Sequence, residues 1–412
     1  VDVVAVRQEC RKFAEGWIDI QREEFKRLGI TGNWADPYLT MDYHAEAVIA
    51  EEFMKFLMNG SLYQGSKPVM WSPVEKTALA EAEVEYHDHT SHTIWVRFKP
   101  QGGALDGASV VIWTTTPWTI PQNRAVAYNP AISYGAYRVD EVAENATAAV
   151  SEVLVLADKL AEGVMGAAKV SGFTRLHDVP TSAFEGLSLA HPYRGLAENK
   201  EWDFDVPMLP GDHVTDDAGT GFVHTAPSHG DDDYQMGLKF GLPMTYNVEP
   251  DGTYRKDLPV FGGQAILTPE GKEGPANVSV IRALAGAEKL FAKGKLKHSY
   301  PHSWRSKAPV IYRNTPQWFV AIDKPLTDGM GQHGDTIRAR ALTSIDKLVQ
   351  WTPQTGRNRL YSMIEARPDW VLSRQRAWGV PLTCFTKKGT RPADADFLLR
   401  NADLNARIKA AF

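Results

Sequence analysis

The chain has 412 residues, of which 43% are hydrophobic and 23% charged, so a disordered tail, a fibrous repeat and a small disulfide-stapled protein are excluded, and two or three domains are expected. No run approaches roughly 18 consecutive apolar residues, so we expect no membrane span, and the two cysteines, Cys10 and Cys384, indicate a reducing, cytoplasmic protein without a cysteine-based metal site. The net charge of −5 gives no general reason to expect a nucleic-acid partner.

The N-terminal part of the chain predicts two amphipathic helices. The second begins at about Asp42 and ends at Gly60, and the first ends near Gly29, because glycine commonly follows the last turn of a helix. Spacings of three and four residues place one apolar stripe on the first helix: Val6, Cys10, Phe13, Trp17 and Ile20. The apolar faces of both helices are expected to lie in a hydrophobic core.

From about Glu83 the pattern changes to that of strands. Ile94, Val96 and Phe98 alternate with polar or partly polar neighbours, and short apolar runs follow at 110–113 and 153–156. Glycine and proline punctuate the region, which predicts a separate strand-rich α+β domain over residues 85–300. After Tyr300 the chain is rich in Trp, Arg and Pro, with helices expected at about 335–349 and 356–366.

Charge is unevenly distributed along the chain. Residues 1–292 carry a net charge of −17, whereas residues 293–376 carry +9 and the remaining tail adds +3. A basic block of this size is able to face phosphates. The alternative is a solvated surface whose charge is balanced by the acidic part, and charge alone does not decide between the two.

A first polar cluster is the stretch 113–119, Trp-Thr-Thr-Thr-Pro-Trp-Thr, directly after an apolar strand. Hydroxyl groups donate and accept hydrogen bonds, so this segment suits a substrate with ribose hydroxyls and an ester. The alternative is an ordinary strand end, because Thr and Trp favour strands in any case.

A second polar cluster spans 219–234, where two histidines and three consecutive aspartates follow a short glycine-flanked strand. The carboxylates are able to bind a substrate ammonium, hold a metal or cap a helix, and capping is the commonest use of such a run. The histidines do not match a known zinc spacing. A separate triplet, His87, His89 and His92, resembles a metal cluster, but we expect it in a polar loop.

A third cluster, at 369–381, combines two arginines, a glutamine and two tryptophans. Guanidinium and indole groups suit stacking together with phosphate or carboxylate contacts. An Arg-rich junction between a strand and a helix is the structural alternative.

In this order the three clusters resemble the isoleucyl-tRNA synthetases, a family of class I aminoacyl-tRNA ligases. The resemblance covers nearly the whole chain, and Thr116-Pro117-Trp118 and His224-Thr225-Ala226-Pro227 favour the isoleucine enzymes over the valyl and leucyl relatives. Further matching segments are 16–17, 25–30, 37–41, 67–73, 78–86, 300–305 and 315–319. Ser303 stands where many relatives have cysteine.

The resemblance implies a fold of α/β and α+β class, in which a strand-rich editing (connective peptide) domain is inserted into a Rossmann-type catalytic domain. Residues 85–300 would form the editing domain, and 1–84 and 301–412 the catalytic segments on either side. The family's His-x-Gly-His and Lys-Met-Ser-Lys-Ser motifs are absent from this sequence. We therefore expect a fragment that does not form isoleucyl-adenylate, with ATP and Mg²⁺ required by the full-length ligase and no cofactor or metal required for editing.

The resemblance also implies the site residues and partners. Asp233 would pair with the α-ammonium of a mischarged valyl group, the threonines would hold the terminal adenosine and a hydrolytic water, and His224 would shape the aminoacyl pocket. The implied catalytic residues are Thr114, Thr115, Thr116 and Asp233, and the implied substrate-binding residues are Trp118, Asn123, His224, Gln375 and Trp378. The expected partner is tRNA(Ile), which carries valine or isoleucine as an ester. The protein is expected to be a monomer. The alternative is a tRNA-binding fragment without independent catalysis.

Overall fold

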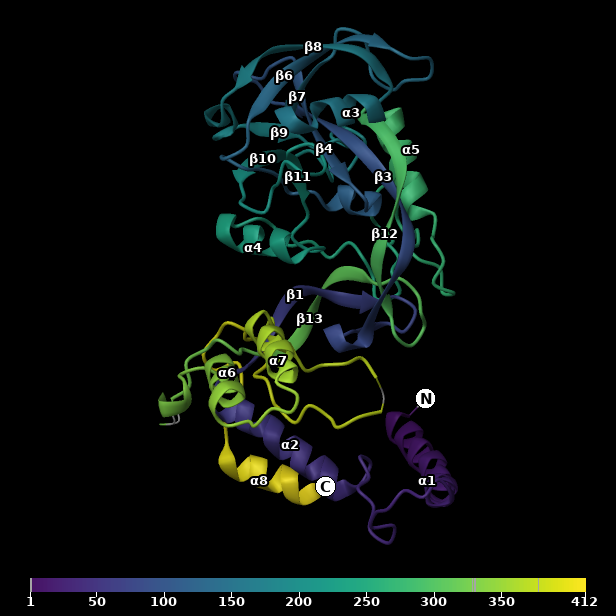
Figure 1. Cartoon of the computed structure of the whole chain (residues 1–412), viewed down its shortest axis with the longest axis vertical. Coiled ribbons are helices and arrows are strands. Elements are labelled where there is room, and N and C mark those ends of the chain that lie inside the picture. Colours follow the sequence, from purple (N-terminus) through teal and green to yellow (C-terminus); the bar gives the residue numbers. More distant parts are fainter. Residues whose placement is uncertain (1, 328, 330, 377) are drawn as a thin grey trace. The chain divides into compact units, whose positions relative to one another are not determined.

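The structure is a computed structural model that describes residues 2–327, 329, 331–376 and 378–412 (Figure 1). The chain divides into two compact units, of which the first joins Val1–Ser66 to Pro316–Phe412 and the second is Lys67–Thr315. Strands β1 (Leu62–Ser72) and β13 (Ile311–Val320) carry the chain from one unit to the other. The predicted domain, residues 85–300, lies inside the second unit. That unit begins earlier in the sequence, at Lys67, and ends later, at Thr315.

The first unit contains most of the helices. They are α1 (Val3–Arg27), α2 (Tyr43–Met58), α6 (Ile337–Lys347), α7 (Thr355–Glu365) and α8 (Ala402–Ala411), with the short η5 (Gly331–His333) and strand β14 (Trp370–Val371). The four helices expected from the sequence pattern are confirmed. The side chains of Asp2 and Asp42 cap α1 and α2 by accepting backbone N–H groups, and Gly29 and Gly60 follow the two helices with positive φ of 77° and 81°.

The two N-terminal helices differ in what their apolar faces do. The core prediction is confirmed for α2, because Phe53, Met54 and Leu57 are buried and pack with Phe397 and Leu398. It is wrong for α1, in which none of the described side chains is buried. Phe13 is 69% exposed and Trp17 is 47% exposed. A periodic stripe shows which face of a helix is apolar, but burial requires a second element to pack on that face.

The second unit is built around a large sheet. Its strand order is β11-β5-β10-β9-β3-β4-β7-β6-β8, and β12 pairs with β3 beside this path. The strands of this sheet are β3 (Val84–Pro100), β4 (Ala108–Thr114), β5 (Ala125–Tyr128), β6 (Tyr134–Val142), β7 (Val153–Ala157), β8 (Val170–Val179), β9 (Ser188–Ala190), β10 (Asp205–Pro210), β11 (Phe222–Thr225) and β12 (Leu290–Ser303). Strand β2 (Thr77–Ala78) pairs with β1 instead. The helical segments are α3 (Ala161–Ala167), α4 (Asp231–Phe240), α5 (Ala276–Gly286), η1 (Glu81–Glu83), η2 (Pro117–Gln122), η3 (Asp158–Leu160) and η4 (Thr181–Phe184).

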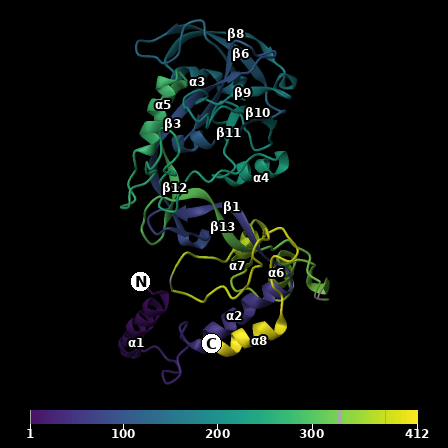
Figure 2. The ribbon, with the colours of Figure 1, turned by 180° about the vertical axis from the view of Figure 1, so that it is seen from behind.

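The predicted strands supply the core of this sheet. Ile94, Val96 and Phe98 are fully buried in β3, and the apolar runs of β4 and β7 are buried beside them. Figures 1 and 2 both show α5 alongside β3 and β12, where α5 buries Val280 and Leu284. The described chain is therefore a mixed α/β structure with a strand-rich second unit.

The histidine triplet at 87–92 lies on β3, so its expected placement in a loop is wrong. β3 and β12 form a long antiparallel pair in register from His92↔Lys295 to Val84↔Ser303, and backbone pairing across that length holds the polar residues in strand conformation. His89 contacts Tyr300 with ring centroids 5.1 Å apart, and His92 pairs with Glu273 at 3.2 Å. No group of three or more His, Cys, Asp or Glu side chains suited to a metal ion occurs among the described residues.

A hydrogen-bonded carboxylate joins two turns of the second unit near Ser303. The Oε1 atom of Glu75 accepts the hydroxyl of Ser303 at 2.8 Å and the backbone N–H of Ser306 at 2.9 Å. Burial raises the pKa of Glu75, but hydrogen bonds from Ser72, Ser303 and Ser306 outweigh this effect and hold the pKa below its usual value.

The described helices include none that is long and apolar enough to cross a bilayer.

Candidate functional site

The Thr-rich segment begins where β4 ends and continues into η2. Thr114 is the last residue of β4, and Pro117 opens η2 after Thr116 has taken the N-cap position. Proline suits the first helical position because its missing N–H would have no partner there. The strand and the turn together place Thr114, Thr116 and Thr119 within hydrogen-bonding reach of one another.

A chain of hydrogen bonds runs from these threonines to His224 on β11. The hydroxyls of Thr114 and Thr116 lie 3.1 Å apart, and the Thr119 hydroxyl donates to the carbonyl oxygen of Thr116 at 2.8 Å. Since the Thr119 proton is used in that way, its oxygen is an acceptor for the Nε2–H of His224, 2.9 Å away. The sequence places Thr119 and His224 105 residues apart, and the pairing of β11 with β5 brings them together.

The protonation state of His224 follows from its second partner, Asn123. The Asn123 side-chain nitrogen donates to the carbonyl oxygen of Ala125 at 2.8 Å and lies 2.8 Å from Nδ1 of His224. Nδ1 therefore accepts, and Nε2 carries the proton. Burial, together with nearby His229, lowers the pKa of His224 to about 3, so the ring is neutral near pH 7. Both ring nitrogens of His224 are therefore engaged in hydrogen bonds, which leaves no free lone pair for a general base.

Asp233 lies in the first turn of α4, which follows β11 after a short loop. Its Oδ2 atom accepts the backbone N–H of Ala226 at 2.9 Å, and this is the one hydrogen bond that Asp233 makes among the described residues. The run of three aspartates was expected to cap a helix, but the N-cap of α4 is Gly230 and no described side chain caps this helix by a hydrogen bond. The Asp233 carboxylate bonds instead to Ala226, before the helix begins. Burial, opposed by the Ala226 N–H and reinforced by Asp232, raises the pKa of Asp233 to about 6. A partly buried carboxylate with a raised pKa favours a cationic partner.

His229 is a further candidate that the sequence did not single out. Its Nδ1–H donates to the carbonyl oxygen of Tyr312 at 2.8 Å, and its ring meets the Trp118 indole edge-on with centroids 4.9 Å apart. Burial is the largest effect on its pKa, which is lowered to about 4. The only sequence signal was its position five residues after His224, because its partner lies 83 residues further along the chain.

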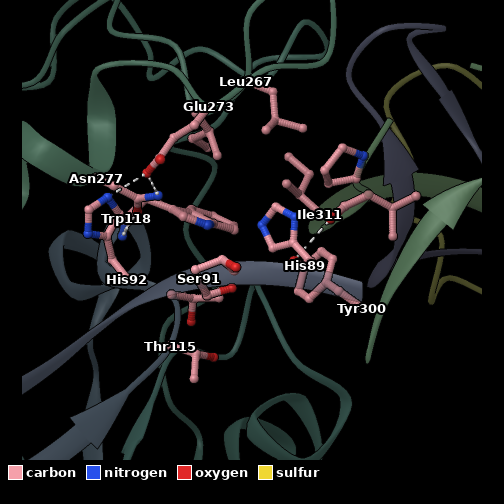
Figure 3. A pocket seen from close by; sticks show the side chains of 15 residues that line it. His89, Ser91, His92, Thr115, Trp118, Leu267, Glu273, Asn277, Tyr300 and Ile311 are labelled. Carbon is pink, nitrogen blue, oxygen red and sulfur yellow. Dashed lines mark hydrogen bonds and ion pairs between the residues drawn. The ribbon is translucent and has the colours of Figure 1, made fainter. Parts of the chain in front are cut away.

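A pocket opens beside the Thr-rich segment (Figure 3). Thr115, Thr116 and Trp118 line it together with side chains of β3, β12 and the region before α5. Figure 3 shows the carboxylate of Glu273 between His92 and Asn277, at 3.2 Å and 2.9 Å. Hydroxyl, imidazole and indole groups face the same space, which suits a small ligand with both polar and apolar parts.

The predicted site residues therefore separate into two groups. The second unit holds all those of the first two clusters, although four of them do not line the pocket in Figure 3: Thr114, Asn123, His224 and Asp233. Gln375 and Trp378 belong to the first unit. There Gln375 donates to Gln317 at 3.1 Å, and the guanidinium of Arg11 lies 5.5 Å from the centre of the Trp378 ring.

Comparison with known proteins gives a consistent result. A family model described as tRNA synthetases class I (I, L, M and V) matches residues 2–398. An isoleucine–tRNA ligase from Ruegeria pomeroyi is 64% identical over 419 residues, which cover 100% of this chain and 43% of that protein. One from Bradyrhizobium diazoefficiens is 51% identical, covering 100% of this chain and 42% of that protein. The chain thus spans less than half the length of these curated relatives.

A solved structure described as GlLeuRS-CP1 is 17% identical and covers 36% of this chain and 59% of that one. Its TM-score is 0.28, which does not establish a common fold.

Proposed function

Because this chain belongs to the class I tRNA synthetases of the isoleucine, leucine, methionine and valine group, we propose that its second unit hydrolyses the ester of tRNA(Ile) mischarged with valine. Isoleucine exceeds valine by one methylene, and in the standard example, which is this enzyme family itself, a hydrophobic pocket separates the two by only about 1–3 kcal/mol. A second site that admits valine and excludes isoleucine supplies the missing selectivity.

The observation that carries the proposal is a partly buried carboxylate with a raised pKa in the same unit as a neutral, fully hydrogen-bonded histidine. Asp233 provides the negative charge that an α-ammonium group requires, and its Oδ1 atom is left for that partner. His224 offers no lone pair, so its role is to limit the size of the amino-acid side chain. In this proposal the threonine hydroxyls hold the terminal adenosine and the attacking water, and the 3.1 Å distance between those of Thr114 and Thr116 supports a shared role.

In this scheme water attacks the ester carbonyl, the bond to the ribose oxygen breaks, and valine and a free ribose hydroxyl are released. The described residues of the site contain no nucleophile paired with a base, because His224 has both nitrogens engaged. We therefore attribute the acceleration of ester hydrolysis to the positioning of the ester, the water and the adjacent ribose hydroxyl.

The remaining parts of the proposal concern the longer protein. Isoleucine activation would require ATP and Mg²⁺ and a complete Rossmann-type catalytic domain, to which the first unit contributes. Gln375 and Trp378 would belong to its amino-acid pocket. The 412-residue chain itself is proposed to need no cofactor for hydrolysis.

The direct test is deacylation of Val-tRNA(Ile) and Ile-tRNA(Ile) side by side by the 412-residue chain. We expect loss of the valyl ester well above the uncatalysed rate and an isoleucyl ester that stays at that rate. Equal loss of both esters would contradict the size limit assigned to His224. Salt-sensitive binding of both tRNAs without hydrolysis would instead support the second candidate, a tRNA-binding module acting through the +9 charge of residues 293–376.

The pH dependence of hydrolysis is expected to report the ionisation of Asp233. Its pKa of about 6 means that the carboxylate forms as pH rises through that value, so kcat/KM for Val-tRNA(Ile) should increase between pH 5 and 7. The uncatalysed hydrolysis is subtracted at each pH. Asp232→Asn is the matched control, since Asp232 is exposed and raises the pKa of Asp233. That variant should keep the rise and move its midpoint to lower pH, whereas a flat profile in the parent chain would contradict the assignment.

A further inference from the structure

We infer that three buried side chains, Tyr254, His191 and Trp202, are positioning residues that hold the η2 turn and through it the histidine of the site. The inference rests on the proposed editing function. The three residues lie outside all three polar clusters of the sequence, and they reach η2 from different parts of the second unit.

Each of the three donates one hydrogen bond to a backbone carbonyl of η2. The hydroxyl of Tyr254 donates to the carbonyl oxygen of Trp118 at 2.6 Å, and the indole N–H of Trp202 donates to that of Pro121 at 2.9 Å. The imidazole of His191 contacts the carbonyl oxygen of Ile120 at 3.2 Å. All three side chains are buried, with exposed fractions of 0% for Tyr254 and His191 and 1% for Trp202.

The direction of the His191 bond follows from its other nitrogen. Nδ1 lies 3.1 Å from the backbone N–H of Tyr193 and accepts it, so the proton is on Nε2 and is donated to Ile120. Burial and nearby Arg124 hold the pKa of His191 well below its usual value. The ring is therefore neutral and carries the proton on the nitrogen that faces η2.

The turn makes some of its own hydrogen bonds, such as that from the Asn123 N–H to the carbonyl oxygen of Ile120 at 3.0 Å, and donors from outside add to them. A 3₁₀-helix has poorer hydrogen-bond geometry than an α-helix, and Pro121 lacks the N–H that would bond within the turn. A buried carbonyl without a partner is costly, so side chains that fit these positions fix the turn in place. The backbone N–H of Trp118 also has a side-chain partner, because the side-chain oxygen of Asn277 accepts it at 3.1 Å.

This turn and the residue after it carry the groups that define the site. Trp118 lines the pocket, Thr119 bonds Nε2 of His224, and Asn123 bonds Nδ1 of His224. A displacement of η2 therefore changes both hydrogen bonds of His224 at once. The size limit and the placement of the ester depend on that geometry, and a misplacement on the scale of an ångström is able to lower kcat strongly.

The chain contains a matched control within the same aromatic cluster. Tyr193 is also fully buried, and its hydroxyl donates to the carbonyl oxygen of Val280 in α5 at 3.1 Å rather than to a carbonyl of η2. Its ring packs against Trp202 with centroids 5.2 Å apart. Tyr193→Phe therefore removes one buried hydrogen bond, as Tyr254→Phe does, but no hydrogen bond to η2.

The experiment compares Tyr254→Phe with Tyr193→Phe in the 412-residue chain. The amide of Gln122, oriented to donate, also reaches the carbonyl oxygen of Trp118 at 3.0 Å, so the first variant leaves that carbonyl partnered and should fold. We measure melting temperature, kcat and KM for Val-tRNA(Ile), the valyl-to-isoleucyl rate ratio, and the ¹⁵N resonances of the His224 ring. Similar falls in melting temperature are expected for both variants.

For Tyr254→Phe we expect kcat to fall about tenfold with KM within about twofold, a lower rate ratio and shifted His224 resonances. Tyr193→Phe should leave kcat and the His224 resonances unchanged. Unshifted His224 resonances in Tyr254→Phe, or an equal loss of kcat in both variants, would overturn the positioning role. If the parent chain hydrolyses neither ester, the proposed function fails, while the His224 resonances still decide whether Tyr254 positions the ring.

Discussion

Replacing Asp233 by asparagine should stabilise the protein at pH 7 and at the same time abolish most of its hydrolysis of Val-tRNA(Ile). Burial raises the pKa of this carboxyl from 3.8 to about 6, so keeping it ionised at neutral pH costs the folded state about 3 kcal/mol at about 1.4 kcal/mol per pKa unit. Asparagine resembles the protonated form and can still accept the N–H of Ala226. Removing the charge also removes the partner of the α-ammonium, an effect of about 2–5 kcal/mol, or roughly 30- to 5,000-fold in rate.

The sign of the stability effect fixes how it varies with pH. A carboxyl whose pKa is higher in the folded state binds its proton more tightly there, so the parent chain gains stability relative to the variant as pH falls through about 6. Urea unfolding of both proteins at pH 4, 5, 6 and 7 measures this difference. The Asp233→Asn advantage should be largest at pH 7 and vanish near pH 4. A variant less stable than the parent at pH 7 would show that the carboxylate is stabilised by contacts rather than penalised by burial.

Truncating Glu152 to alanine should produce the largest loss of stability, because it leaves a buried guanidinium without its counter-charge. Arg97 is only 6% exposed, and its Nη2 atom donates to Glu152 Oε2 at 3.0 Å. The same group also donates to the carbonyl oxygens of Thr147 at 2.8 Å and Leu290 at 2.7 Å, so it joins β3 to β12 and to the loop before β7. Breaking one side of such a buried pair costs about 3–5 kcal/mol.

Denaturant unfolding of Glu152→Ala measures this cost, and two further variants interpret it. The double variant Arg97→Met with Glu152→Leu should recover much of the loss, since an apolar pair of similar volume removes the uncompensated charge. Asp178→Ala removes one of the two carboxylate partners of Arg175, an exposed pair at 2.6 Å, and should change stability little because Asp158 remains. If Glu152→Ala lowered the free energy of unfolding no more than Asp178→Ala, the prediction would be wrong. The Arg97 guanidinium would then be solvated by water in the variant.

Local structure follows closely from residue pattern in this chain. Helices α1, α2, α6 and α7 and the strands around Ile94, Val110 and Val153 form where the periodicity of apolar residues predicts them. The reason is that helix and strand periods depend on neighbours within a few residues, which the sequence shows directly. The motifs that indicate the family are local in the same sense, and the family match over residues 2–398 agrees with them.

The sequence by itself thus determined the local elements and the family. Tertiary structure alone decided that α1 leaves Phe13 and Trp17 exposed and that the histidine triplet lies on β3. It also decided that both nitrogens of His224 are used and that Tyr254, His191 and Trp202 support η2. The physical reason is that these features depend on burial and on hydrogen bonds between residues about 70 to 140 positions apart, and such pairs meet only once the sheet has formed.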